Sequence, residues 1–341
     1  MIIIRKRAYA RAGLLGNPSD GYHGKTISVI VRNFWAEVVL YEWDSVDIVL
    51  AEDDRARFRS VFDLAQDVNL HGYYGGIRLV KATIKRFVEY CQTRGLKLHD
   101  RNFSVRYQSN IPRQVGLAGS SAIIVATLRC LMEFYDIEIP LEVQPTFALA
   151  VETEELGISA GLQDRVIQCY ESAVYMDFDR SCERIVEGLT CFNYEPLDTT
   201  LLPPLYISYH IALSEPTEQF HNNIRERFDR GEEPVVQAMK HFAQLTAQGR
   251  EALLNRDQGQ LATLIDENFD SRDKIYSIPQ WQAQMVEIAR RCGATAKFAG
   301  SGGAIIGTYR DEAMFGELQT YLAEIGSRTI KPQLTGEPPN E

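Results

Sequence analysis

The run SSAIIVATLRCLMEFY, which ends at Tyr135, places apolar residues on almost every side of a helix. A helix that is apolar all round has to be buried, so the chain must build structure around it. The chain has 341 residues, of which 45% are hydrophobic. At about 150 residues per domain this length suggests two domains, each able to bury a core. We therefore predict a two-domain globular protein in which this helix is buried.

The rest of the chain predicts a mixture of strands and helices. In the first half we expect strands over 2–11, 25–42, 102–109, 172–178 and 184–193, and helices over 74–93, 143–156 and 162–170. In the second half we expect helices over 217–230, 232–255, 258–274, 280–292 and 311–325, and strands at 297–300, 304–309 and 328–332. The proline-rich stretch 195–209 separates them, so we predict α+β domains over 1–198 and 199–341.

Charge and composition exclude several classes of protein. Lys plus Arg is 36 and Asp plus Glu is 46, which gives a net charge of −10 and argues against a nucleic-acid partner. The N-terminus MIIIRKRAYARAG has the wrong order for a signal peptide, and no apolar stretch reaches the roughly 18 residues of a membrane span. The six cysteines form no CxxC pair. We therefore expect a cytoplasmic protein with reduced thiols and no membrane partner.

A glycine-rich segment, 116–122, leads into the apolar helix. Small residues let a ligand approach the backbone, and the N–H groups and dipole of a helix start attract phosphate. Ser120 and Ser121 could also offer oxygen to Mg²⁺. The alternative is that this Gly-Ser turn merely caps the helix.

Two further glycine segments are less specific. The segment 300–303 (GSGG) lies between two expected strands and suits either a phosphate contact or a tight hairpin. Gly24-Lys25-Thr26 resembles the end of a Walker-type phosphate loop. However, Ser19 stands where that motif needs its first glycine, and the residues after Lys25 are typical of a strand rather than a helix. We therefore reject a Walker-type nucleotide site.

Three segments, in this order and spacing, resemble the motifs of the GHMP kinases, which include galactokinase, homoserine kinase, mevalonate kinase and phosphomevalonate kinase. They are 8–20, 111–122 and 297–304. Other segments are similar to plant-type glucuronokinases, namely 15–20, 33–36, 72–76, 110–114, 155–158, 160–166, 201–205 and 268–270. This resemblance, from about residue 7 to about residue 307, implies transfer of phosphate from ATP to the anomeric oxygen of D-glucuronate. The products would be D-glucuronate 1-phosphate and ADP.

The resemblance also implies a fold and a nucleotide site. The fold would combine an N-terminal ribosomal-protein-S5-like α/β domain, with a left-handed β-α-β unit, and a C-terminal ferredoxin-like domain, with the site in the cleft between them. The cradle for ATP would be Gly116, Leu117, Ala118, Gly119, Ser120, Ser121 and Ala122. Mg²⁺ would be held by Ser120 and by a carboxylate of the run 151–155, where the family's E-x-E pattern falls on Glu152 and Glu154. We favour Glu154 and expect Glu155 to face solvent.

Two residues match the catalytic positions of the family. Asp164 matches the catalytic aspartate, which would accept the proton of the anomeric hydroxyl. Its alternatives are a helix N-cap or an ion pair with Arg165. Arg11 matches a cation beside that aspartate, which would stabilise charge during transfer. Its alternative is a surface arginine at the end of a strand.

The sugar would be bound by several further residues. Asp20 matches a ligand of the sugar hydroxyls, although Asn-Pro-Ser-Asp-Gly is also a strong turn sequence. Asn17-Pro18 replaces a Glu-His pair of galactokinase, so we do not expect galactose as substrate. The complete set of expected substrate residues is Asn17, Asp20, Tyr73, Tyr74, Arg113, Arg165, Gly300, Ser301, Gly302 and Gly303.

The carboxylate of the sugar acid should require an arginine fork. Arg113, Arg165 and Arg78 are the candidates, with Tyr73 or Tyr74 as hydroxyl partners, and the sequence does not rank them. Two other functions stay open: another anomeric kinase, for galacturonate, fucose or a heptose phosphate, and a non-catalytic sugar or nucleotide sensor.

Overall fold

The computed structural model describes residues 2–49, 75–212 and 224–336. Its first sheet contains β1 (Ile3–Leu15), β2 (Lys25–Trp43), β3 (Asp47–Val49), β4 (Asn102–Ser109), β5 (Ala173–Asp177) and β8 (Asn193–Leu197). The strand order is β3-β4-β2-β5-β8, with β1 paired to β2. All pairs are antiparallel except β3 and β4, which run parallel and are connected through α2 (Gly76–Thr93). The expected β-α-β unit is therefore present.

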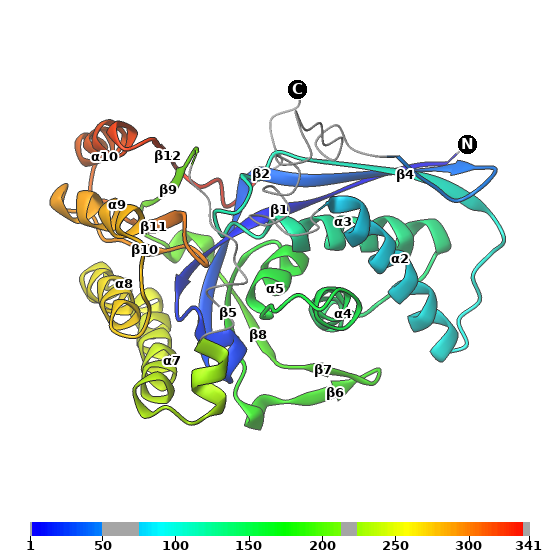
Figure 1. Cartoon of the computed structure of the whole chain (residues 1–341), viewed down its shortest axis with the longest axis horizontal. Coiled ribbons are helices and arrows are strands. Elements are labelled where there is room, and N and C mark those ends of the chain that lie inside the picture. Colours follow the sequence, from blue (N-terminus) through cyan, green and yellow to red (C-terminus); the bar gives the residue numbers. More distant parts are fainter. Residues whose placement is uncertain (1, 50–74, 213–223, 337–341) are drawn as a thin grey trace, which may run out of the picture.

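The apolar helix predicted from the sequence is α3 (Gly119–Tyr135), and most of its side chains are buried. Figure 1 shows α2, α3, α4 (Gln144–Ala150) and α5 (Gln163–Tyr170) together on one side of the first sheet. The large apolar surface of α3 is thus covered by the sheet and by its neighbouring helices. This arrangement confirms the prediction that the helix is buried.

Several elements of the first half differ from the prediction: β1 continues to Leu15, and β3 and β8 were not expected as strands. The expected helix 143–156 ends as an α-helix at Ala150 and continues as a π-helical turn over Val151–Glu155. The expected strand 184–193 is instead a hairpin of β6 (Arg184–Val186) and β7 (Leu189–Cys191), after which β8 begins. Glu187 and Gly188 form the turn, both with positive φ (50° and 73°). Two such residues suit a two-residue hairpin turn, which the strand pattern did not indicate.

The second sheet contains β9 (Leu205–His210), β10 (Lys297–Phe298), β11 (Ala304–Thr308) and β12 (Ser327–Ile330). It is antiparallel with the order β10-β11-β9-β12. Helices α7 (Glu233–Leu254), α8 (Gln258–Asp273) and α9 (Gln280–Arg291) lie between β9 and β10 in the chain, and α10 (Glu312–Glu324) lies between β11 and β12. This strand order is that of a ferredoxin-like domain. The expected helix 217–230 lies partly outside the described residues, and 224–229 are helical.

The two halves share one hydrophobic core. The largest cluster of buried residues includes Leu40 and Leu128 from the first half together with Ile207, Leu264 and Ala304 from the second. A smaller cluster lies within the second half, and a third lies between α5 and the first sheet. None of the helices that the structure describes is both long enough and apolar enough to cross a membrane.

Candidate active site

Strand β1 runs between the two glycine-rich loops. The backbone N–H of Arg11 donates to the oxygen of Leu117 (3.3 Å), and the N–H of Gly13 donates to the oxygen of Ala299 (2.7 Å). These bonds join three segments that are far apart in the chain. The three motifs seen in the sequence therefore meet at one place in the fold.

The two loops also contact each other directly. A Cβ added to Gly300 would lie 2.2 Å from the oxygen of Gly116, and one added to Gly116 would lie 2.9 Å from the nitrogen of Ser301. Neither contact leaves room for a side chain. The segment 300–303 does connect the antiparallel strands β10 and β11, so the hairpin expectation is correct. The hairpin additionally packs its tip on the loop that precedes α3.

The start of α3 is suited to bind an anion. No side chain among the described residues caps its first turn, because the hydroxyl of Ser120 donates to Glu152 (2.8 Å) and that of Ser121 to the oxygen of Ala118 (3.3 Å). Ala118 has a positive φ of 64°, which turns the chain into the helix. The alternative that this segment is a simple serine cap is therefore wrong. The N–H groups and dipole of α3 are available to a phosphate.

The carboxylate that faces Ser120 belongs to Glu152, not to Glu154. Glu152 is buried, whereas the side chain of Glu154 is 60% exposed and pairs with Arg86 (2.6 Å). Glu155, expected in solvent, pairs with Lys85 (2.6 Å) and is only 13% exposed. The physical reason is the π-helical turn over Val151–Glu155, which places side chains on different faces from those of a regular α-helix. The side chain of Glu154 therefore does not face Ser120 in the structure, and its role as a metal ligand stays a prediction.

Arg165 is buried, and its side chain bonds to other groups of the protein. Its side chain forms an ion pair with Glu152 and donates to the oxygen of Gly161 (2.7 Å). Burial, together with the charge of Arg11, lowers the pKa of Arg165 to about 9, so it remains a cation at neutral pH. A guanidinium with these partners is not placed to receive the carboxylate of a substrate, contrary to the expectation for this residue.

Arg11 and Asp164 form an ion pair at the beginning of α5. The side chain of Arg11 is buried and also donates to the oxygen of Ala299 (2.5 Å). Arg11 is therefore not a surface arginine. Asp164 also lies 3.3 Å from a nitrogen of Arg165, so the alternative of an ion pair with Arg165 is present as well. The result is a continuous chain of charged contacts from Arg11 through Asp164 and Arg165 to Glu152.

Asp20 lies in the 3₁₀ turn Ser19–Tyr22 and faces the start of α5. It accepts hydrogen bonds from the backbone and side chain of Gln163 (3.4 and 3.2 Å). A Cβ on Gly161 would lie 2.0 Å from its carboxylate. Burial and the nearby negative charge of Asp164 raise the pKa of Asp20 to about 6. Asp20 is therefore in a turn, as its sequence suggests, but a turn that points into the same site as Asp164.

Asn17 belongs to the scaffold beneath the site. It is 1% exposed, its side-chain oxygen accepts from the ammonium of Lys297, and its side-chain nitrogen donates to the oxygen of Phe298 (3.3 Å). Lys297 also donates to the oxygens of Gly13 (2.7 Å) and Phe298 (2.8 Å). Burial, together with the charges of Arg272 and Arg11, holds the pKa of Lys297 well below its usual range. The structure thus uses Asn17 to join two motifs rather than to face a sugar.

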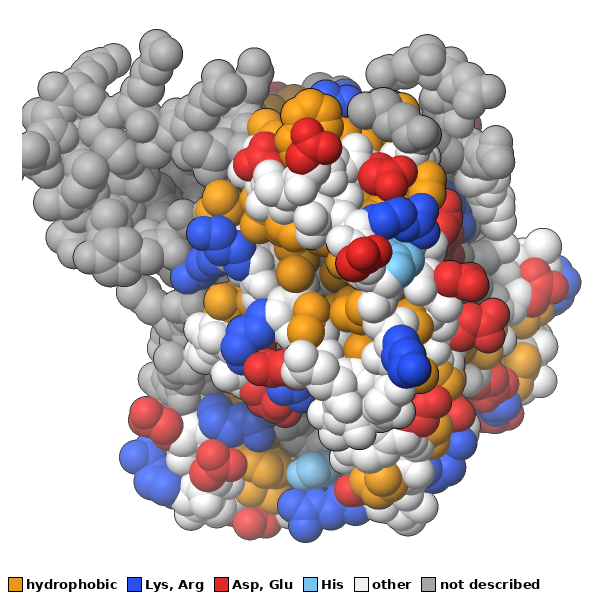
Figure 2. Space-filling model, turned by 90° about the vertical axis from the view of Figure 1, so that its right-hand side faces the viewer, with side chains coloured by type: hydrophobic (Ala, Val, Ile, Leu, Met, Phe, Trp, Pro, Cys, Tyr) orange, Lys and Arg blue, Asp and Glu red, His pale blue; other side chains and the backbone are white. Residues whose placement is uncertain are grey.

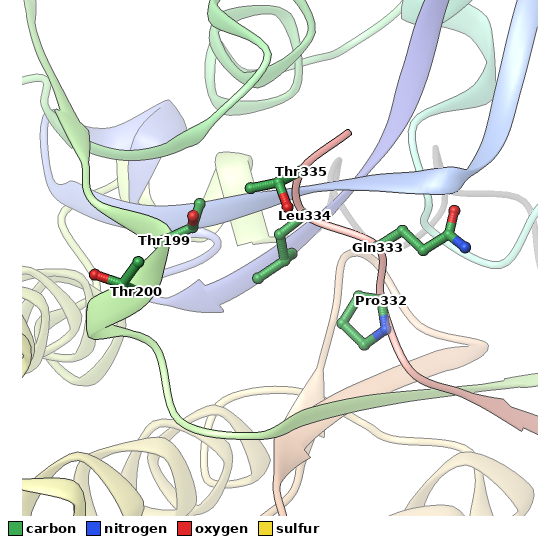
Figure 3. A pocket seen from close by; sticks show the side chains of 6 residues that line it. All are labelled: Thr199, Thr200, Pro332, Gln333, Leu334 and Thr335. Carbon is green, nitrogen blue, oxygen red and sulfur yellow. The ribbon is translucent and has the colours of Figure 1, made fainter. Parts of the chain in front are cut away.

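Other expected residues lie elsewhere. Tyr73 and Tyr74 are outside the described residues, Arg113 is exposed in the segment before the 116–122 loop, and Arg78 lies in the first turn of α2. Figure 3 shows the side chains around a pocket between the residues after β8 and the C-terminal stretch. Its volume is about 530 Å³. It is lined by Thr199, Thr200, Pro332, Gln333, Leu334 and Thr335, none of which is an expected site residue.

Comparison with known proteins assigns the chain to a family. Residues 78–172 match the GHMP kinases N terminal domain family. Over 312 residues the chain is 43% identical to glucuronokinase 1 of Arabidopsis thaliana. This alignment covers 89% of this chain and 84% of that protein. The chain belongs to the GHMP kinases. It is also 42% identical, over the same length and with the same coverage, to probable glucuronokinase 2 of that plant.

The solved structure of Lactococcus lactis galactokinase complexed with galactose shares the fold of this GHMP kinase. Its TM-score is 0.75 at 14% identity, over 97% of this chain and 93% of that one. The two-domain fold and the kinase resemblance expected from the sequence are thus confirmed.

Some residues of this GHMP kinase site were missed in the sequence. Arg272 of α8 is buried and donates to the oxygens of Gly300 and Ser301 (both 2.8 Å), which holds the second glycine loop in place. Lys297 and Gln163 lie inside the motif segments 297–304 and 160–166, and this position is the signal by which the sequence could reveal them. Arg272 lies two residues after the 268–270 segment, outside any motif. Its role in holding the 300–303 loop is seen only from its burial and its hydrogen bonds in the structure.

Proposed function

We propose that the chain phosphorylates D-glucuronate at its anomeric oxygen, using ATP, to give D-glucuronate 1-phosphate. The observation that carries this proposal is the Arg11–Asp164 ion pair, which lies beside the uncapped start of α3. It combines a carboxylate for the sugar hydroxyl with a phosphate cradle, in a chain that is 43% identical to a protein named glucuronokinase. Phosphoryl transfer depends mainly on such positioning and charge stabilisation.

The nucleotide would bind on the 116–122 loop with its phosphates at the start of α3. The oxygens of Ser120 and Glu152 would hold Mg²⁺, since a hydroxyl and one carboxylate are hard oxygen ligands of the kind that Mg²⁺ takes along with phosphates and water. The two oxygens are 2.8 Å apart, close enough for both to bind the same ion. When bound, Mg²⁺ neutralises phosphate charge.

The sugar would bind between Asp164, Asp20 and the loop 300–303. Asp164 would accept the proton of the anomeric hydroxyl as that oxygen attacks the γ-phosphate. Arg11 would stabilise the negative charge that develops there, because it is buried and its donors already point at the site. Asp20 would accept a hydrogen bond from another sugar hydroxyl.

We further propose that the domains divide near residue 198 and that the enzyme works in the cytoplasm on small molecules alone. The boundary is supported by the stretch between β8, in the first sheet, and β9, in the second. No nucleic acid is expected as a partner, since the net charge is −10.

The test is ADP release by the purified chain with a panel of sugars: D-glucuronate, D-galacturonate, D-glucose, L-fucose and a heptose 7-phosphate. We expect the highest kcat/KM for glucuronate, loss of activity when Mg²⁺ is chelated, and a ³¹P signal of an anomeric phosphate. Asp164→Asn should lower kcat by about 10²- to 10⁴-fold while ATP still binds. A higher kcat/KM for another sugar would show that this other sugar is the substrate. No ADP release with any sugar would favour the alternative function, a non-catalytic sugar or nucleotide sensor.

A further inference from the structure

Arg225 lies next to the proposed sugar site but was not among the residues expected there. It belongs to the helical residues 224–229 of the second half. Its Nη2 donates to the oxygen of Gly21 (2.7 Å), the residue that follows Asp20. A Cβ on Gly21 would lie 3.1 Å from the same nitrogen, so the absence of a side chain lets the guanidinium come close.

The fork of Arg225 has unused donors. A guanidinium carries five N–H groups, and in the described part of the chain Arg225 uses one side of its fork for Gly21 and has no carboxylate partner. Its central carbon lies 4.4 Å from the centre of the buried Tyr22 ring. Stacking on an aromatic face fixes the plane of the guanidinium and leaves its edge open to a planar anion.

Three other arginines of this region already have partners among the described residues. Arg227 forms a bidentate pair with Glu232 and donates to the oxygen of Ile275 (2.7 Å). Arg165 is paired with Glu152, and Arg272 is bonded to backbone oxygens. Among these neighbours, Arg225 is the arginine that retains a fork for a ligand.

The carboxylate of a sugar acid would add negative charge to the site. Asp20 and Asp164 are both acidic, and a sugar acid adds a third carboxylate. The electrostatic influence of Asp20 and of Arg225 reaches the same buried phenol, Tyr276, whose pKa is raised mainly by burial. A hexuronate is a compact ring, so a substrate that meets Asp20 with a hydroxyl presents its carboxylate close to the neighbours of Asp20.

We propose that Arg225 binds the carboxylate of the sugar acid and thereby selects a uronate over a neutral sugar. This inference rests on the proposed function. A charge-assisted, two-point bond to a carboxylate is the strongest contact that such a fork can make.

The test compares D-glucuronate with D-glucuronamide, in which a neutral amide replaces the carboxylate. The wild-type chain should have a higher kcat/KM for glucuronate by about 10- to 100-fold. Arg225→Gln should remove most of this preference, chiefly through KM for glucuronate, while KM for ATP stays within about twofold. Arg225→Lys, which keeps the charge but not the fork, should restore part of it.

Arg230→Gln is the matched control, since it removes one exposed positive charge from the end of the same segment. It should keep the preference. The ratio of two substrates on one variant is not moved by a general loss of folded protein, so a destabilised Arg225→Gln remains interpretable. The inference is overturned if Arg225→Gln keeps the wild-type ratio, or if Arg113→Gln removes it instead. If the wild-type chain phosphorylates no sugar acid at all, the proposed function itself is wrong.

Discussion

At the scale of single residues, charge is arranged as an alternating chain. Arg11, Asp164, Arg165 and Glu152 contact one another in that order, and Glu152 then accepts from Ser120. The proposed base and the proposed metal ligand are therefore connected by one arginine. Burial makes each of these contacts stronger than it would be in water, and it also makes each unpaired member costly.

Glu152 and Glu154 provide a matched pair of substitutions for the metal site. Glu152→Gln should raise the Mg²⁺ concentration for half-maximal activity at least about tenfold, because it removes the buried carboxylate beside Ser120. Glu154→Gln removes only an exposed ion pair with Arg86 and should change this concentration less than about twofold. Kinetics at varied free Mg²⁺ would measure both. The reverse order of effects would return the role to Glu154.

Asp20 should give sugar binding a pH dependence. Its pKa is about 6 in the folded chain and 3.8 in a solvated reference, so the folded protein holds the proton between these values. The contribution of Asp20 to the free energy of unfolding therefore falls as pH rises from about 4 to about 6. Binding needs the ionised form, so calorimetry should show about tenfold tighter glucuronate binding at pH 7 than at pH 5. Asp20→Asn should bind weakly without this dependence, and a flat wild-type profile would contradict the assignment.

At the scale of elements, the site depends on how the two glycine loops contact each other. The hairpin tip 300–303 is held by Arg272 from α8, while Lys297 in β10 holds β1 and Asn17. Both cations use their donors on backbone or amide oxygens rather than on carboxylates. Elements of the second half therefore shape the loop of the first half that leads into α3.

Gly300→Ala tests this contact. Its Cβ would meet the oxygen of Gly116 at 2.2 Å, so one loop must move, and we expect kcat/KM to fall about tenfold or more. Gly316→Ala is the control, since nothing lies within 4 Å of its Cβ in α10. It should leave activity unchanged and stabilise the fold by about 0.5–1 kcal/mol. Steady-state kinetics and denaturant unfolding measure the two effects, and full activity of Gly300→Ala would show that the loops need not touch.

At the scale of the whole molecule, positive charge is concentrated where the two halves meet. Among the described residues, the buried Lys and Arg side chains are Arg11, Arg165, Arg272 and Lys297. Arg272 donates to the 300–303 loop, and Arg11 and Lys297 donate to residues just before it. Arg165 pairs with Glu152, which accepts from Ser120. Figure 2 shows acidic and basic side chains interspersed over one outer face. The net charge of −10 therefore describes the surface, while the site for two anionic substrates is built on buried cations.

The shared core predicts that both halves unfold together. Trp35 and Trp43 lie in β2 of the first half, and Trp281 lies in α9 of the second, so fluorescence can follow each half separately. The variant Trp281→Phe leaves fluorescence only in the first half, and the double variant Trp35→Phe with Trp43→Phe leaves it only in the second. For each variant, the urea midpoint followed by fluorescence should agree with the midpoint followed by circular dichroism within about 0.2 M. Two clearly separated midpoints within one variant would show that the halves are energetically independent.

Local sequence was sufficient for most elements and for the family. The spacing of apolar residues predicted α2, β4, α3, α7 and α8 to within a few residues, because such periodicity follows from the geometry of one helix or strand. The residues of the three motifs identified the kinase family, and Arg11 and Asp164 do lie in contact. The elements followed from residue type and spacing, whereas the family and the Arg11–Asp164 pair followed from the resemblance of these motifs to known kinases.

Tertiary structure decided which side chains meet. A π-helical turn set Glu152 rather than Glu154 against Ser120, and burial gave Arg165 and Lys297 interior partners. The packing of 224–229 on the turn brought Arg225 against Gly21, the residue after Asp20. Arg225 and Gly21 are 204 positions apart in the chain. Local propensity acts over a few residues and carries no information on such pairs, because long-range packing alone determines which surfaces of two elements touch.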